Sequence, residues 1–163
     1  MELSINLKRM LDLVDEVFES KSDPNQLSFT EEDMEHLQAL HPACLNEHAN
    51  EDGPYAWISI FPTSSDLANK FVGGKSTERE LFDKTLELNP TQLNTVYLCS
   101  ALVLPEFRKN MIAFTTTIQA IEGMKNNLPI HQLLVWPFSH EGEQLAKKIA
   151  KASQLPLLIK KYS

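Results

Sequence analysis

The chain has 163 residues, 42% of them hydrophobic and 23% charged, which is typical of one soluble globular domain spanning residues 1–163. It contains no apolar stretch of membrane-spanning length, and its first ten residues lack the basic start and apolar core of a secretion signal. The net charge of −7 is uneven: residues 1–54 contain 13 acidic and 3 basic residues, whereas residues 55–163 contain 9 acidic and 12 basic ones. This distribution argues against nucleic acid as the main partner but allows a small anion to bind the second part. Two distant cysteines, Cys44 and Cys99, indicate free thiols in a reducing cytoplasm.

Two helices are expected first. Ser4 can cap a helix whose apolar residues recur at intervals of three and four positions and so face the core. These residues are Leu7, Met10, Leu11, Val14, Val17 and Phe18. A loop is predicted over Lys21–Ser28, and Thr30 begins a second helix, with acidic residues in its first turn, which Pro42 ends. The core-facing residues of this second helix are Met34, Leu37 and Leu40.

A hairpin and two short helices follow. Residues 55–61 are aromatic and β-branched and predict a strand. The turn signal Asp52-Gly53 and a weaker strand near residues 43–46 would complete a hairpin with it. The two short helices are predicted over residues 65–72, before Gly73-Gly74, and from the capping box of Thr77 and Glu80 to about residue 88.

The rest of the chain predicts a βαβ unit. Its strands cover residues 95–103 and 132–136, and the helix between them has one apolar face. Ser139 can cap a last helix, and residues 157–159 suit a final short strand. The crossover helix makes the two strands of the unit parallel, whereas the hairpin before them is antiparallel. The strands over residues 55–61 and 95–103 should be antiparallel neighbours. We therefore expect an α/β fold with a mixed central sheet flanked by helices.

A phosphate site is predicted where the strand over residues 95–103 meets the next helix. Pro105 ends the apolar run, a polar turn over residues 106–110 follows, and a helical pattern starts at once. The first amides of a helix have no partner within it and lie at the positive end of its dipole, so they bind anions. Arg108, one of only three arginines against twelve lysines, lies in this turn, and its guanidinium suits a phosphate.

This region also resembles a known family. Residues 103–113 (VLPEFRKNMIA) are similar to the signature of the GNAT superfamily of acyl-CoA N-acyltransferases, in which the fourth strand ends in Val-x-Pro-x-x-Arg and continues into Arg-x-x-Gly-x-Gly/Ala. The predicted order of elements resembles the family order too, and the local match covers residues 95–152. The segment over residues 60–71 resembles the loop after the third family strand, whereas the first family strand is not evident.

The resemblance implies that acetyl-CoA is a co-substrate and assigns the residues that would bind it. The turn and helix start would hold the coenzyme pyrophosphate through Arg108, Lys109, Asn110, Met111, Ile112 and Ala113. The strand end would pair with the pantetheine arm and polarise the thioester carbonyl through Ala101, Leu102 and Val103. Ser139, at the start of the last helix, is assigned to the same site.

The chain departs from the family pattern at two positions. Met111 stands where members usually have glycine, and its side chain either weakens phosphate binding or points into the core. Aligning the family motif Asn-x-x-Ala-x-x-x-Tyr on residues 139–146 puts Ala146 in place of the tyrosine that acts as general acid. The leaving thiolate would then be protonated by water or another group, or the protein would not turn over.

Other side chains are weaker candidates for chemistry. The two parallel strands should splay apart at their C-terminal ends and leave an opening near Val103 and Trp136. His140, near this opening, could act as a catalytic acid or base, or be a solvated residue at a helix start. Glu78 and Glu80 could act as bases, but helix capping explains them more simply. Cys99 is interpreted as a packing residue of its strand. No metal site is expected, because the histidines at positions 36, 41 and 48 lack the spacing of metal ligands.

We therefore expect a cytoplasmic acyl-CoA-dependent N-acyltransferase that transfers an acetyl group to a primary amine of a small molecule or peptide. The alternative is a non-catalytic GNAT-like domain that binds acyl-CoA or a protein partner, and Met111 and Ala146 favour this alternative. A doubly wound nucleotide-binding domain is disfavoured because the chain has no glycine-rich turn. Nucleic acid and membrane are not expected as partners, and a homodimer stays open.

Overall fold

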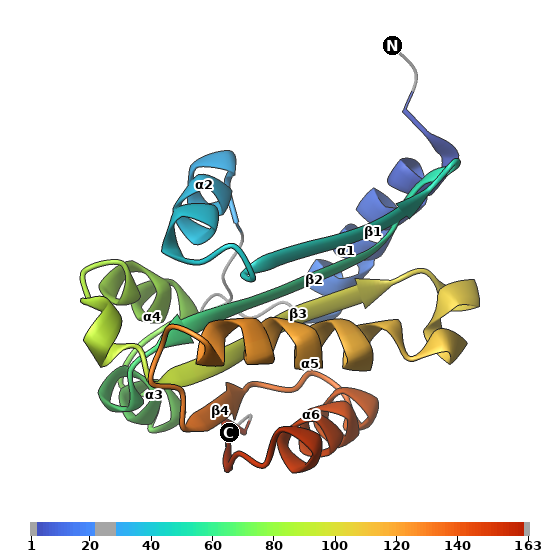
Figure 1. The fold of residues 1–163 in the computed structure, drawn as a ribbon. Helices are drawn as coiled ribbons and strands as arrows, with labels where there is room; N and C mark the ends of the chain where they lie inside the picture. The colour runs from blue at the N-terminus through green and yellow to red at the C-terminus, as the bar shows by residue number, and fades with distance from the viewer. Residues whose placement is uncertain (1–2, 22–28, 162–163) are drawn as a thin grey trace.

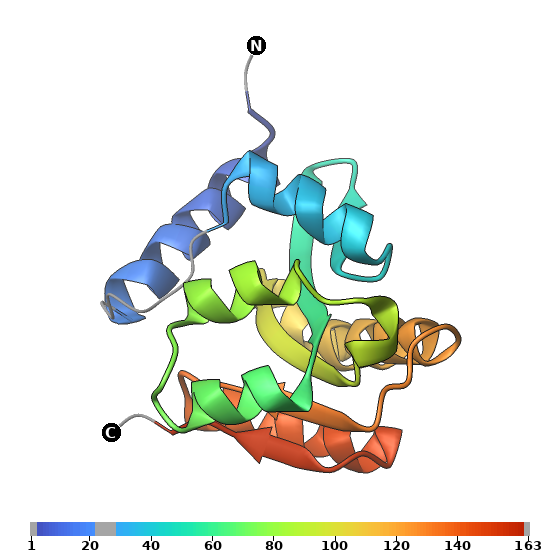
Figure 2. The ribbon, with the colours of Figure 1, turned by 90° about the vertical axis from the view of Figure 1, so that its left-hand side faces the viewer.

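The computed structural model describes residues 3–21 and 29–161, which form a five-stranded sheet with helices on both faces (Figures 1 and 2). The strands, in their order across the sheet, are β1 (Leu45–Asn50), β2 (Gly53–Thr63), β3 (Thr95–Val103), β4 (Gln132–Val135) and β5 (Leu157–Ile159). The α-helices are α1 (Ile5–Lys21), α2 (Glu31–Leu40), α3 (Ser65–Val72), α4 (Glu78–Thr85), α5 (Ile112–Lys125) and α6 (His140–Ser153). Two 3₁₀-helices, η1 (Pro90–Gln92) and η2 (Pro105–Asn110), precede and follow β3. No helix in these described residues is long and apolar enough to span a membrane.

The sheet is mixed, as predicted. β1 and β2 form an antiparallel hairpin, and β2 pairs antiparallel with β3. β3 pairs parallel with β4, and β4 pairs parallel with β5, through the crossover helices α5 and α6. The predicted antiparallel and parallel neighbours of β3 are therefore both confirmed, and β3 lies at the centre of the sheet.

Helices α5 and α6 cover one face of the sheet, and α1, α3 and α4 lie on the other (Figures 1 and 2). On the second face, four rings from β2, β3, α3 and α4 meet edge to face: Phe61, Tyr97, Phe71 and Phe82. All four side chains are fully buried. Such ring pairs each contribute about 0.5–1.5 kcal/mol beyond the area they bury, so this cluster fixes β3 against the helices behind it.

Two elements differ from their predicted positions. β1 covers residues 45–50 rather than a stretch near 43–46, and it includes polar residues that do not suggest a strand. It is an edge strand, so its backbone pairs with β2 while polar side chains face solvent. α4 ends at Thr85 rather than near residue 88, because the amides of Glu87 and Leu88 bond to carbonyls three residues back and tighten the chain into a turn.

The predicted apolar faces of α1 and α2 are partly wrong. Met10 and Leu37 are fully buried, but Leu11 is 43% exposed and Met34 is 44% exposed. Each helix therefore buries a narrower stripe than the spacing of its apolar residues suggests. The predicted side chains of Val17 and Phe18, and the predicted loop over residues 22–28, lie outside the described residues.

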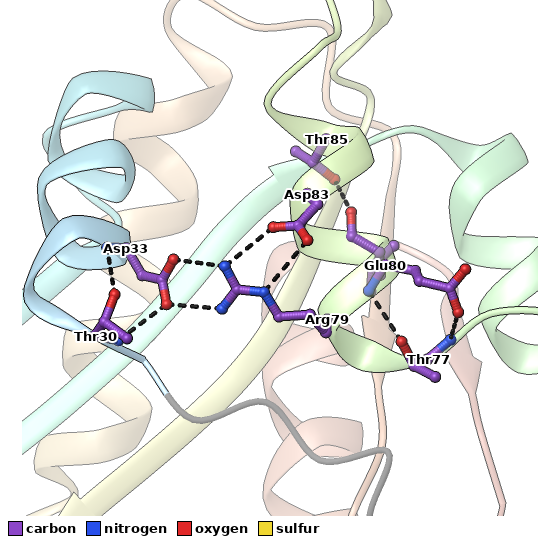
Figure 3. Close-up of polar contacts among 8 residues, drawn as sticks. Thr30, Asp33, Thr77, Arg79, Glu80, Asp83 and Thr85 are labelled. Atoms are coloured by element: carbon purple, nitrogen blue, oxygen red, sulfur yellow. Dashed lines mark hydrogen bonds and ion pairs between the residues drawn. The ribbon is translucent and has the colours of Figure 1, made fainter.

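A bidentate ion pair joins α2 to α4 (Figure 3). The Nη1 and Nη2 atoms of Arg79 each donate to a carboxylate oxygen of Asp33 at 2.7 Å. The Asp33 side chain is 4% exposed, whereas Arg79 is 44% exposed. The backbone N–H of Thr30 also donates to Asp33 at 2.9 Å, completing the capping box of α2. The hydrogen bonds from Arg79 hold the pKa of Asp33 well below its usual range.

Candidate functional site

The parallel strands β3 and β4 separate halfway along β3. Their pairing ends where Leu98 lies opposite Val135. β3 continues beside β2 as far as Val103, whereas the chain after Val135 leaves the sheet and turns into α6. The second half of β3 therefore has no β4 residue beside it, as expected for a parallel pair that splays at its C-terminal ends.

A cleft of about 360 Å³ fills this gap. We call it the β3–β4 cleft. It is bounded by residues 59–60 of β2, residues 98–102 of β3, residues 135–139 at and after the end of β4, and residues of α5 and α6. The sequence predicted an opening near Val103 and Trp136. Trp136 lines the cleft, but Val103 does not, because it is buried where β3 pairs with Ala56 of β2. The opening is therefore deeper in the sheet than predicted.

A β-bulge in β3 lies at the level where β4 departs. Ser59 of β2 pairs with Ser100, and the next residue of β2, Ile60, pairs with Leu98. Cys99 is therefore the extra residue of the bulge, between these two pairs. A bulge bends its strand and increases the local twist, so the bulge and the end of the β4 pairing together form the cleft.

The wall of the β3–β4 cleft is mainly apolar. Leu145, Ala146 and Ile149 of α6 form one side. Its polar side chains include Ser59 and Ser100, whose hydroxyls are 2.6 Å apart, and Thr117 of α5. Within the described chain, no Asp, Glu, Lys, Arg or His side chain lines it. Such a wall suits a neutral ligand segment with a few hydrogen-bonding groups.

The predicted anion turn is a 3₁₀-helix, η2, joined to α5 by one residue. That residue, Met111, has the left-handed conformation, with φ 56° and ψ 29°. The first bond of α5 runs from the amide of Thr115 to the carbonyl of Met111 at 2.9 Å. The amides of Ile112 and Ala113 belong to the first turn and have no acceptor within the helix. They form the type of helix start that binds anions.

The predicted residues of this turn are exposed, and Arg108 has a structural partner. Its Nε donates to the carbonyl of Val103 at 2.9 Å, which ties η2 to the end of β3. Arg108, Lys109 and Asn110 are exposed. Met111 is 57% exposed, so of the two alternatives for its side chain, the one in which it points into the core is wrong. The backbone turn, rather than that side chain, fixes the position of the loop.

The residues predicted after β4 divide between the cleft and solvent. Ser139 lines the β3–β4 cleft, and its hydroxyl accepts a hydrogen bond from the amide of Gly142 at 3.0 Å. Ala146 is 2% exposed and forms part of the wall. His140, the first residue of α6, is exposed and does not line the cleft. The structure thus brings Ser139 and Ala146 together with Ala101 and Leu102 but leaves His140 outside.

The other candidates have structural partners. Glu78 is buried and accepts a hydrogen bond from the hydroxyl of Tyr97. Glu80 accepts from the amide of Thr77 at 3.0 Å, as the capping box predicts. Two of the three histidines of the first part, at positions 41 and 48, bond to an asparagine and a threonine. No cluster of three or more potential metal ligands occurs in the described part of the chain.

Cys99 and Thr117 are among the cleft residues that were not predicted as site residues. Cys99 is half-buried and lines the cleft, although its position in a strand suggested only packing. Thr117 lines the cleft from α5. A bulge has no sequence signal here, and the pattern of α5 does not show which of its three successive threonines faces the sheet.

Comparison with models of protein families, with curated proteins and with solved structures found no match for this chain.

Proposed function

We propose that the protein binds acetyl-CoA in the β3–β4 cleft and transfers the acetyl group to a primary amine of a small molecule or peptide, as a divergent GNAT-type N-acyltransferase. The observation that carries this proposal is the separation of β3 from β4 into a cleft that no charged side chain of the described residues lines, with η2 connecting the end of β3 to the start of α5. A pantetheine arm is neutral and carries amides that can pair with the free edge of β3 as an added strand. The residues present therefore fit this co-substrate.

The two ends of acetyl-CoA would meet different groups. The pyrophosphate would lie at the start of α5, near the amides of Ile112 and Ala113 and the guanidinium of Arg108. The thioester would lie beside Ala101 and Leu102, where a backbone N–H can polarise its carbonyl. Transfer requires the amine to attack that carbonyl while the thiolate leaves. A thiol of ordinary pKa, about 8.5, can depart at neutral pH without an acid, so Ala146 does not forbid the reaction.

Calorimetric titration with acetyl-CoA tests the binding. We expect heat for the wild type and about 1–3 kcal/mol weaker binding for Arg108→Ala, the range of a hydrogen bond to a charged group. Arg108→Lys keeps the charge but loses the planar donor to Val103, so it should fall between the two. Lys147→Ala, an exposed residue of α6 paired with Glu143, removes the same charge and should bind like the wild type. Absence of heat at millimolar acetyl-CoA would refute the coenzyme assignment.

The second candidate is a GNAT-like module that binds acyl-CoA without turning it over. Ala146 favours it, because the wall of the cleft has a methyl group where the family has its general acid. Release of free thiol across polyamines, amino acids, aminoglycosides and peptide N-termini separates the two candidates. Binding without release for any of these amines would favour the module. His140→Ala should change a measured rate no more than a few-fold, because His140 does not line the cleft. A drop of about a hundredfold or more, the size of a positioned proton transfer, would instead make His140 the catalytic acid or base.

A further inference from the structure

Three successive threonines of α5 have different surroundings. Thr115 is exposed, and Thr116 is buried with its hydroxyl 2.7 Å from Nε2 of His48. Thr117 is 4% exposed and lines the β3–β4 cleft. Its side chain has no hydrogen-bond partner among residues 3–21 and 29–161. Buried hydroxyls nearly always have a partner, so this one is a group whose partner a ligand can supply.

Thr117 lines the cleft, and its hydroxyl is not among the described side-chain atoms that are both unpartnered and fully enclosed by protein, so part of its surface stays accessible. α5 and α6 pack together, and Thr117 and Ala146 belong to the same cleft wall. Where the family pattern expects a tyrosine hydroxyl from the last helix, this chain therefore has a methyl group on α6 and a free hydroxyl on α5.

We propose that the hydroxyl of Thr117 donates a hydrogen bond to the sulfur of the coenzyme A leaving group. This inference rests on the proposed function. In the transfer step the amine nitrogen forms a bond to the thioester carbonyl carbon, the carbon–sulfur bond breaks, and its electron pair stays on sulfur. The amine loses one proton to water, and water later protonates the thiolate. Thr117 keeps its own proton and stabilises the negative sulfur while the bond breaks.

The experiment compares coenzyme A with desulfo-coenzyme A, which lacks the sulfur, on the wild type, Thr117→Val, Thr117→Ser and Thr116→Val. Valine has the shape of threonine without its hydroxyl, serine keeps the hydroxyl, and Thr116→Val removes a neighbouring buried hydroxyl whose partner is His48. Calorimetry gives both affinities at a pH above the thiol pKa, and the ultraviolet absorbance of the thiolate gives its fraction when bound. Melting curves establish that each variant is folded.

We expect the wild type to hold bound coenzyme A with a thiolate-to-thiol ratio about tenfold or more above that of the free ligand, in the range for hydrogen bonds to charged acceptors. Thr117→Val should lose this gain and bind coenzyme A about tenfold more weakly, with unchanged affinity for desulfo-coenzyme A. Thr117→Ser and Thr116→Val should behave like the wild type. If the wild type binds both ligands equally and the thiolate fraction is unaltered, the role of Thr117 is refuted while the proposed function stands. This result requires measurements on the wild type only. A wild type that binds neither ligand overturns the proposed function and this role with it.

Discussion

Met111 adopts a backbone conformation that costs free energy for a residue with a Cβ atom. Its φ of 56° places it in the left-handed region, where non-glycine residues lose about 1–2 kcal/mol. Its side chain is 57% exposed and so contributes little packing in return. The position therefore favours glycine for conformational reasons that are independent of phosphate.

Met111→Gly should stabilise the protein by about 0.5–1 kcal/mol, because relief of the left-handed strain exceeds the entropy cost of glycine in the unfolded chain. Affinity for acetyl-CoA should be unchanged or higher, since the backbone turn stays and a side chain is removed. Urea unfolding and calorimetry measure the two quantities. Gln154→Gly is a matched control: Gln154 has φ 58° at the end of α6, so it should gain similar stability with no change in binding. Weaker binding by Met111→Gly alone would contradict the assignment of this turn.

The two cysteines should differ in reactivity. Cys44 is fully buried, and burial raises the pKa of its thiol to about 12, so almost none is in the reactive thiolate form at pH 8. Cys99 lies in the wall of the β3–β4 cleft. Iodoacetamide should therefore alkylate Cys99 in the native protein and leave Cys44 intact, as peptide masses will show. Desulfo-coenzyme A, which has no thiol, should slow the reaction at Cys99. Loss of rapid labelling in Cys44→Ala but not in Cys99→Ala would reverse the assignment.

At the scale of elements, α2 depends on its ion pair with α4. Asp33 is almost fully buried, and its depressed pKa means that it contributes stability above its unfolded value of about 3.9. That contribution is lost progressively as pH falls below about 4, because the carboxylate takes up a proton in the unfolded chain there while it stays ionised in the folded protein until the pH is lower still.

Asp33→Asn should cost about 1–3 kcal/mol at pH 7, towards the lower end because solvent screens the 44%-exposed Arg79. The difference in unfolding free energy between wild type and variant should shrink as pH falls from 4. Asp83→Asn is the control, since Asp83 pairs with the same arginine at 3.1 Å but is 54% exposed; it should cost less than about 1 kcal/mol. Urea unfolding from pH 7 to pH 3 measures both. Equal losses for the two variants, or a loss for Asp33→Asn that is constant with pH, would contradict this account.

Most elements could be predicted because their signals are local. The capping boxes of Thr30 and Thr77, the Gly73-Gly74 stop and the apolar run of β4 each act within a few residues. β1 was misplaced because its pairing comes from β2, not from its own polar sequence. The exposure of Leu11 and Met34 depends on which neighbours cover each helix, which periodicity does not show.

For the whole molecule, one buried cluster extends from Leu37 of α2 through the sheet to Ala150 of α6. The chain should therefore unfold in a single calorimetric transition. A ligand that binds only the folded state adds about 2.7 kcal/mol at a hundred times its Kd, which is a shift of about 5–10 °C for a chain of this size. We expect that shift with acetyl-CoA for the wild type and a smaller one for Arg108→Ala at the same concentration. Two separate transitions would contradict a single domain.

The candidate site was predicted in outline. A βαβ unit places an opening at the C-terminal ends of its strands, and the turn after β3 places a helix start next to it, so residues 101–113 were recognisable. The pairing register was not recognisable, and it decides that Cys99 lines the cleft and that Val103 is buried. The burial of Thr117 depends instead on how α5 packs against the sheet. Long-range contacts set all three.

Because of the bulge at Cys99, the number of residues in β3 is more constrained than the types of residue it contains. Deleting Cys99 would join the two halves of β3 into one uninterrupted register with β2, and so remove the bulge together with the bend and twist that it adds. An insertion there would instead enlarge the bulge or shift residues 100–103 by one position, which turns their side chains to the opposite face. Both changes would alter the cleft. Descendants or designed variants of this chain should therefore accept many residue types at position 99. They should not accept a one-residue insertion or deletion there, although such mutations arise readily.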